Sequence, residues 1–139
     1  MKTTSTRWNV RDKRRLLEAI VEKLAGNAHI SFEGNLRNLT LADIPGAAQD
    51  ETSILKRNTT WPRQDFVVLP LESGTSDRIL TAIGATVPRS VLHIQVEKAG
   101  ILEFAAYDQF DPECVFLGGG IAGEFLDSLV SEGLLEKAK

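Results

Sequence analysis

Apolar residues recur at helical spacing near the start of the chain. Asp12 and Asn9 precede this stretch and suit the first turn of a helix, and Gly26 suits its end. Because one face is apolar and the other polar, the pattern predicts an amphipathic helix over residues 10–25. The apolar stripe consists of Leu16, Leu17, Ile20, Val21 and Leu24.

An alternating apolar and polar pattern follows in the stretch AHISFEGNLRNLTL, residues 28–41. Gly34-Asn35 lies at its centre and is a dipeptide typical of tight hairpin turns. A turn there places Ile30 opposite Leu39, so the apolar faces of the two halves agree, as pairing in register requires. The pattern predicts a β-hairpin.

A second hairpin is predicted in VLHIQVEKAGILEFAAY, residues 91–107. A three-residue loop, residues 98–100, would close it with glycine in the left-handed position. Pairing outward from that loop places Val96 opposite Leu102 and Ile94 opposite Phe104. The other face of the hairpin would collect the polar residues His93, Gln95, Glu97, Glu103 and Tyr107.

Between and after the hairpins, shorter patterns complete the order of elements. DFVVLPL predicts a buried strand that Pro70 places near a sheet edge. A short helix follows, beginning near Ser73 or Thr75 and ending at Gly84. Residues 114–117 predict a short strand, and residues 122–132 predict a final helix.

The resulting order is α-β-β-loop-β-α-β-β-β-α, in which hairpins dominate. We therefore expect an α+β fold with a mainly antiparallel, possibly mixed, sheet of about 5–6 strands and helices on one face. We expect residues 1–139 to form one domain. Its predicted irregular parts are a flexible N-terminus over residues 1–8 and a long connecting loop over residues 42–64.

Composition narrows the classes of function. The 139 residues have a formal net charge of -3, and a nucleic-acid-binding domain usually has a basic excess instead. The single cysteine, Cys114, excludes an internal disulfide and suits a reducing compartment. We find no signal sequence and no apolar run long enough to cross a membrane. We expect a cytoplasmic protein that binds neither nucleic acid nor membrane.

A glycine-rich stretch raises the possibility of a nucleotide site. Gly118, Gly120 and Gly123 have the G-x-G-x-x-G spacing of a dinucleotide-binding turn. Such a site also needs a further strand with an acidic residue about 20 positions on. Only 16 residues follow Gly123, and the predicted final helix uses them. We interpret the glycines as a sharp turn, with anion binding at the helix N-terminus as the alternative.

The histidines and the cysteine suggest no metal site, because their spacing lacks the converging ligands of one. His93 could act as a general base beside Gln95, Glu103 and Tyr107, but an ordinary polar sheet face explains the same pattern. We expect neither a cofactor nor a metal, and no catalytic residue. Cys114 suits a small core residue better than a nucleophile.

The connecting loop contains the strongest signal for binding. Trp61 lies there between Arg57 and Arg63, and Trp and Arg are enriched in interface hot spots. We expect a non-catalytic protein-interaction or regulatory module that binds a protein partner or associates with itself. The alternative is an enzyme or a binding protein for an anionic small molecule. It would use the polar hairpin face and the turn from Gly118 to Gly123. The candidate binding residues are Arg57, Trp61, Arg63, His93, Gln95, Glu103 and Tyr107.

Overall fold

Helices and antiparallel sheets make up the fold, which confirms the predicted α+β class. A computed structural model describes residues 6–138. The elements are β1 (Trp8–Val10), α1 (Lys13–Leu24), β2 (Ala28–Gly34), the 3-10 turn η1 (Leu41–Asp43), β3 (Asp65–Leu71), α2 (Ser73–Ile83), β4 (Val91–Lys98), β5 (Ile101–Ala106), the 3-10 turn η2 (Pro112–Cys114), β6 (Val115–Leu117), α3 (Glu124–Ser131) and β7 (Leu135–Lys137).

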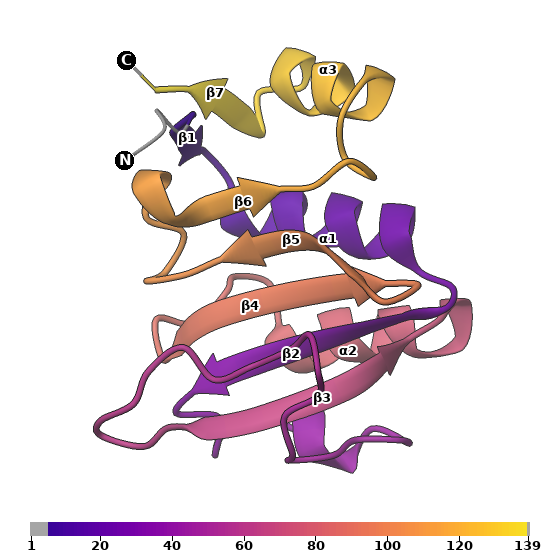
Figure 1. The fold of residues 1–139 in the computed structure, drawn as a ribbon, viewed down its shortest axis with the longest axis vertical. Helices are drawn as coiled ribbons and strands as arrows, with labels where there is room; N and C mark the ends of the chain where they lie inside the picture. Colours follow the sequence, from indigo (N-terminus) through magenta and orange to yellow (C-terminus); the bar gives the residue numbers. More distant parts are fainter. Residues whose placement is uncertain (1–5, 139) are drawn as a thin grey trace.

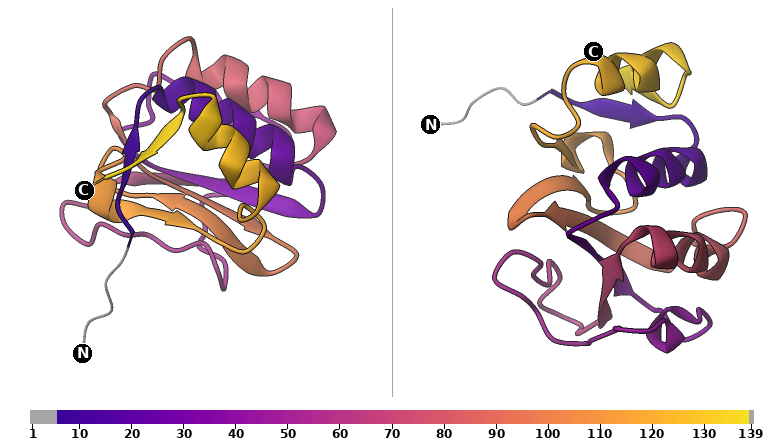
Figure 2. Two further views of the ribbon diagram at one scale, coloured as in Figure 1. Left: turned by 90° about the horizontal axis from the view of Figure 1, so that it is seen from above. Right: turned by 90° about the vertical axis from the view of Figure 1, so that its right-hand side faces the viewer.

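The main sheet is antiparallel, with the strand order β3-β2-β4-β5-β6. Helices α1 and α2 lie on one face of this sheet, as Figures 1 and 2 show. β3 lies at one edge, as Pro70 predicted, because proline has no N–H for a second ladder. The core fills the space between the helices and this face. Its largest fully buried side chains include Phe32, Phe104, Leu16, Leu17 and Ile20.

Helix α1 confirms the apolar stripe but begins later than predicted. Its cap is Asp12, whose carboxylate accepts the N–H of Arg15 at 3.1 Å. Asn9 is not the cap because it lies in β1, opposite Glu136 of β7. Pairing with the distant end of the chain therefore decides where the helix begins.

The predicted hairpin turn at Gly34-Asn35 is wrong. β2 is a central strand, and it pairs with β3 on one side and β4 on the other. Ile30 lies opposite Leu69 and Val96 rather than Leu39. Two long strands offer β2 more pairing and burial than the short segment after it. That segment instead covers one end of the core with its apolar side chains, namely Leu36, Leu41 and Ile44.

The second predicted hairpin exists, but its turn and register differ. Ala99 and Gly100 form a two-residue turn with φ of 53° and 84°, a geometry that suits the twist of paired strands. Val96 consequently lies opposite Phe104, and Ile94 opposite Ala106. The register shifts at the next pair and leaves Glu103 as an additional residue in β5.

The two ends of the described chain pair with each other, which the sequence patterns did not predict. β1 and β7 form a separate two-stranded antiparallel sheet, seen beside α3 in Figure 1. A strand therefore follows the final helix after all. Trp8 belongs to β1 rather than to a flexible N-terminus, and residues 1–5 of that predicted segment lie outside the described residues.

The connection before β3 crosses the sheet face that the helices leave open. We call residues 48–64 the strap. Figures 1 and 2 show it on the side opposite α1 and α2. Ala48 bridges to Val68 at the start of the strap, and Leu55 is fully buried against Phe66 and Val68. Within residues 6–138, no helix is long and apolar enough to cross a membrane.

Candidate functional site

Four polar side chains lie buried beneath the strap. Glu33 is 1% exposed, His93 2% and Gln95 4%, and Ser31 is buried beside them. They come from the neighbouring strands β2 and β4, whose register places Glu33 beside His93 and Ser31 beside Gln95. We call these four residues the buried polar face.

Glu33 binds the main chain of the strap. Its carboxylate accepts the N–H of Asn58 at 2.7 Å and the N–H of Thr59 at 3.2 Å. Buried carboxylates are costly unless they accept such hydrogen bonds. The two amides therefore compensate the burial of Glu33, and Glu33 holds the strap in place.

His93 binds the strap through a hydroxyl. Its Nδ1 accepts the N–H of Asp108 at 3.1 Å, so the ring proton lies on Nε2 and is donated to Thr59 Oγ1 at 2.7 Å. A nucleophilic hydroxyl needs an imidazole nitrogen that can accept its proton. Nε2 carries a proton instead, so the pair suits positioning of the strap rather than nucleophilic catalysis.

Gln95 completes the set of contacts with the strap. Its amide donates to the carbonyl of Lys56 at 2.6 Å and approaches the hydroxyl of Ser31 at 3.3 Å. Tyr107 donates its hydroxyl to the Gln95 side-chain oxygen at 3.4 Å. Burial, and then the negative charge of Glu33, raise the pKa of Tyr107, so this donor keeps its proton at neutral pH.

Glu103, which was predicted to join the polar hairpin face, lies elsewhere. Its carboxylate accepts the N–H of Gly120 at 2.8 Å. A Cβ atom on Gly118 would lie 2.4 Å from Glu103 Oε1 and 2.9 Å from its Cα. The glycine-rich turn is therefore wrapped around a carboxylate of the same chain, which occupies the position where an external anion would approach Gly120.

The three strap candidates differ in how firmly they are held. Arg57 donates to the carbonyl of Gln64 at 2.5 Å, and its guanidinium lies 5.0 Å from the centre of the Phe66 ring. Arg63 is exposed, and Trp61 is 84% exposed. Arg57 and Arg63 both line a groove of about 710 Å³, together with Arg37 and apolar side chains of residues 36–41.

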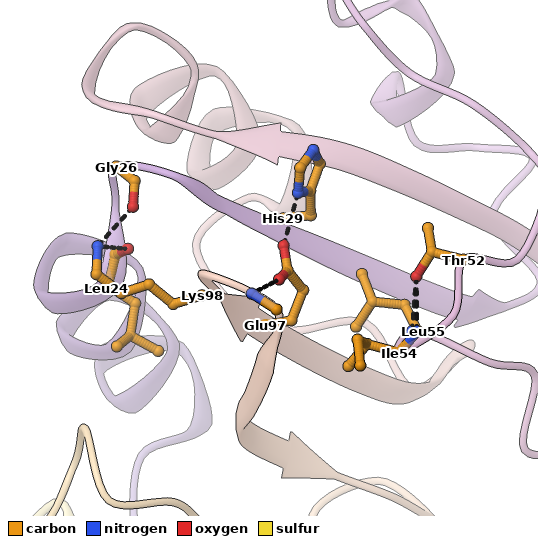
Figure 3. A network of polar contacts seen from close by, with 9 residues as sticks. Leu24, Gly26, His29, Thr52, Ile54, Leu55, Glu97 and Lys98 are labelled. Atoms are coloured by element: carbon orange, nitrogen blue, oxygen red, sulfur yellow. Dashed lines mark hydrogen bonds and ion pairs between the residues drawn. The ribbon is translucent and has the colours of Figure 1, made fainter.

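A separate polar cluster ties the far end of the sheet to α1 (Figure 3). Lys98 donates to the carbonyls of Leu24 at 3.0 Å and Gly26 at 2.5 Å, which satisfies the end of the helix. His29 and Glu97 lie 2.6 Å apart on the neighbouring strands. This cluster joins elements of the fold, and we assign it no ligand.

Cys114 is poorly suited to act as a nucleophile. Burial and the nearby carboxylates of Asp108, Asp111 and Glu113 raise the pKa of its thiol, which disfavours the reactive thiolate. Among the described residues, no group of three or more His, Cys, Asp and Glu side chains could hold a metal ion.

The sequence patterns found part of this arrangement. The structure brings His93, Gln95 and Tyr107 together, places Glu103 at the glycine-rich turn, and puts Arg57, Trp61 and Arg63 in the strap. Sequence reasoning missed Ser31, Glu33 and Thr59. The alternation of polar residues along β2 was a signal for the first two, but the choice of a hairpin gave that strand the wrong neighbour.

Comparisons with known proteins add no family to these observations. The chain matches no protein-family model, and it has no significant similarity to a curated protein or to a solved structure.

Proposed function

We propose that the chain is a non-catalytic protein-interaction module that presents the exposed part of the strap around Trp61 to a protein partner. The observation that carries this proposal is Trp61, which is 84% exposed on a segment whose base is held by buried contacts. A tryptophan side chain has only two rotatable bonds, so it loses little conformational freedom on binding. Trp61 and the exposed Arg63 are residue types that dominate interface energies.

The neighbouring groove supports the same proposal. It lies beside the base of the strap and combines apolar walls with the charged groups Arg37, Asp43 and Asp50. Interfaces commonly combine an apolar centre with a polar rim. We infer that a partner would cover Trp61 and reach into this groove.

The alternative, an anionic-ligand site or an enzyme, receives less support. The polar face that it would use lies beneath the strap, and the Nε2 proton of His93 is already donated to Thr59. The glycine-rich turn faces Glu103, whose negative charge would repel an anion.

The proposal is tested by affinity capture from native lysate with the parent chain, Trp61→Ala and Ile101→Ala. Ile101 is also an exposed apolar residue, 61% exposed, but lies at the start of β5, outside the strap, so it is a matched control. We expect a stoichiometric protein that the parent and Ile101→Ala retain and Trp61→Ala loses. Each variant should show the parent's thermal unfolding, because neither removed side chain is buried.

Light scattering distinguishes a foreign partner from self-association. A parent that is dimeric, and becomes monomeric in Trp61→Ala, would assign the strap to a homodimer. A captured protein that the parent and both variants retain equally would refute the strap as the interface. A co-purifying small molecule that is lost in His93→Ala would favour the alternative function.

A further inference from the structure

The strap lies on the buried polar face much as a bound peptide would. Three of its four polar contacts with that face use main-chain groups, namely the N–H groups of Asn58 and Thr59 and the carbonyl of Lys56. The side chains of Lys56 and Asn58 are exposed. Glu33 and Gln95 therefore bind the polypeptide backbone of the strap and do not select for the side chains of Lys56 and Asn58.

Two strap side chains add selectivity. Leu55 is fully buried against Phe66 and Val68, and the hydroxyl oxygen of Thr59 accepts a hydrogen bond from Nε2 of His93. An apolar residue followed four positions later by Ser or Thr would reproduce both contacts. This residue pattern describes the kind of segment that the buried polar face can bind.

Leu55 is the only buried residue of the strap, so a single buried apolar side chain anchors the strap, and the residues after it have no apolar anchor of their own. Trp61 points into solvent, and Thr60, Pro62 and Arg63 are exposed. Water can replace the hydrogen-bond partners when the strap opens. Each hydrogen bond therefore contributes only about 0.5–1.5 kcal/mol to stability, or about 1.5–3 kcal/mol when one group is charged. Segments held this way open locally at lower free energy than the strands beneath them.

We propose that the buried polar face is a peptide-binding site that residues 55–59 of the chain occupy in this structure. When the strap lifts, a segment of a partner protein, with an apolar residue four positions before Ser or Thr, takes their place. This inference deepens the proposed function and rests on it, since the same strap presents Trp61. The strap would then compete with the partner segment for the buried polar face. Its release would link binding of the partner to exposure of that face.

A strap-weakened chain tests the site directly. The double variant Leu55→Ser/Thr59→Gly removes both selective contacts in the strap and leaves Glu33, His93 and Gln95 intact. The probe is a fluorescein-labelled peptide of residues 52–61, TSILKRNTTW, followed by fluorescence anisotropy. We expect it to bind the double variant at least about tenfold more tightly than the parent, whose own strap competes at high effective concentration.

Two controls make that result specific. Adding Glu33→Gln to the double variant should weaken binding of the peptide by about tenfold, as expected for loss of a charged hydrogen-bonding partner. The same peptide with Ser in place of Leu55 and Gly in place of Thr59 should not bind. Equal binding with and without Glu33→Gln would overturn the proposal, and so would no binding by a double variant that keeps its β4 amides protected.

Hydrogen exchange on the unmodified chain tests release of the strap even if the double variant fails to fold. The amides of Asn58 and Thr59 should exchange at least about 100-fold faster than those of central β4 residues, because local opening exposes them first. Exchange of the two sets at one common rate would show that the strap leaves only on global unfolding and would overturn the proposal. Loss of the captured partner in Trp61→Ala without any of these effects would support the proposed function alone.

Discussion

Glu33 places a carboxylate in a nearly water-free position and gives it two strap amides as partners. The buried polar groups around it are equally satisfied. Within the part of the chain that the structure describes, every buried side-chain nitrogen and oxygen has a hydrogen-bond partner. The stability of the buried polar face depends on each of its side chains, because loss of one hydrogen-bond partner leaves a desolvated group unpaired.

Replacing Glu33 with Gln should lower the free energy of unfolding by about 1–3 kcal/mol. The amide is almost isosteric, but only its oxygen can accept, so its NH₂ would face an N–H of Asn58 or Thr59. Urea denaturation measures the loss. Glu132→Gln is the matched control, since Glu132 is exposed. A change no larger than that of the control would contradict the role assigned to Glu33.

Cys114 should react slowly with iodoacetamide at neutral pH, because its raised pKa reduces the thiolate fraction. Asp108 lies near the thiol, with Oδ2 3.7 Å from Sγ. Asp108→Asn should lower the thiol pKa and raise the alkylation rate at fixed pH by about two- to fivefold. Mass spectrometry follows the reaction, with the exposed Asp127→Asn as the control. A slower reaction in Asp108→Asn would contradict this assignment.

The turn between β6 and α3 depends on close packing of backbone against β5. Gly118 donates its N–H to the carbonyl of Glu103 at 2.7 Å, so the chain has little room at that point. Gly119 faces open space, with no heavy atom within 4 Å of a Cβ placed on it. The two adjacent glycines therefore have different structural roles.

Gly118→Ala should destabilise the protein by about 1–3 kcal/mol or more, the range for overpacking a close contact. The added methyl group would lie 2.9 Å from Glu103 Cα and 3.0 Å from the Leu102 carbonyl. Gly119→Ala should change stability by less than about 0.5 kcal/mol. Thermal unfolding compares the pair, and equal losses would show that contact with Glu103 does not matter.

Pairing of the two chain ends completes the core of the molecule. β7 lies beside β1, and Leu134 and Leu135 are buried in the same hydrophobic cluster as α1. The N–H of Ala138 also bonds to the carbonyl of Arg7. Residues at opposite ends of the sequence thus contribute to one packed interior.

Leu135→Ala should cost about 2–5 kcal/mol of unfolding free energy, as for other buried leucines. Val130→Ala is the control, because Val130 lies nearby in sequence but is 44% exposed, and its loss should be well below that of Leu135→Ala. Urea denaturation followed by circular dichroism measures both. Equal costs would mean that β7 is not part of the cooperative core.

Local sequence patterns were sufficient to predict an element when its apolar side chains all face the same core. The stripe of α1, the strand at residues 65–71 and the edge position of Pro70 follow from side-chain periodicity and from the chemistry of proline. The glycine at position 100 likewise marked the turn of the β4–β5 hairpin, although pairing across that turn moved with the additional residue in β5.

Choices between competing partners required the tertiary structure. β2 could pair with the segment after it or with two distant strands, and its alternating pattern is compatible with both. The burial of Glu33 could not be predicted for a similar reason. Whether its strand face is exposed to water or covered by the strap depends on a segment about 25 residues away. β1 and β7 are short, and only their mutual pairing makes them strands.

By itself, therefore, the sequence determined the α+β class, the amphipathic elements and the chemical character of the strap, since these depend on local spacing and residue type. The tertiary structure decided strand order, the closure of the chain ends and the burial of the polar face. Those properties are set by which long-range pairs bury the most apolar surface and satisfy the most backbone groups at once.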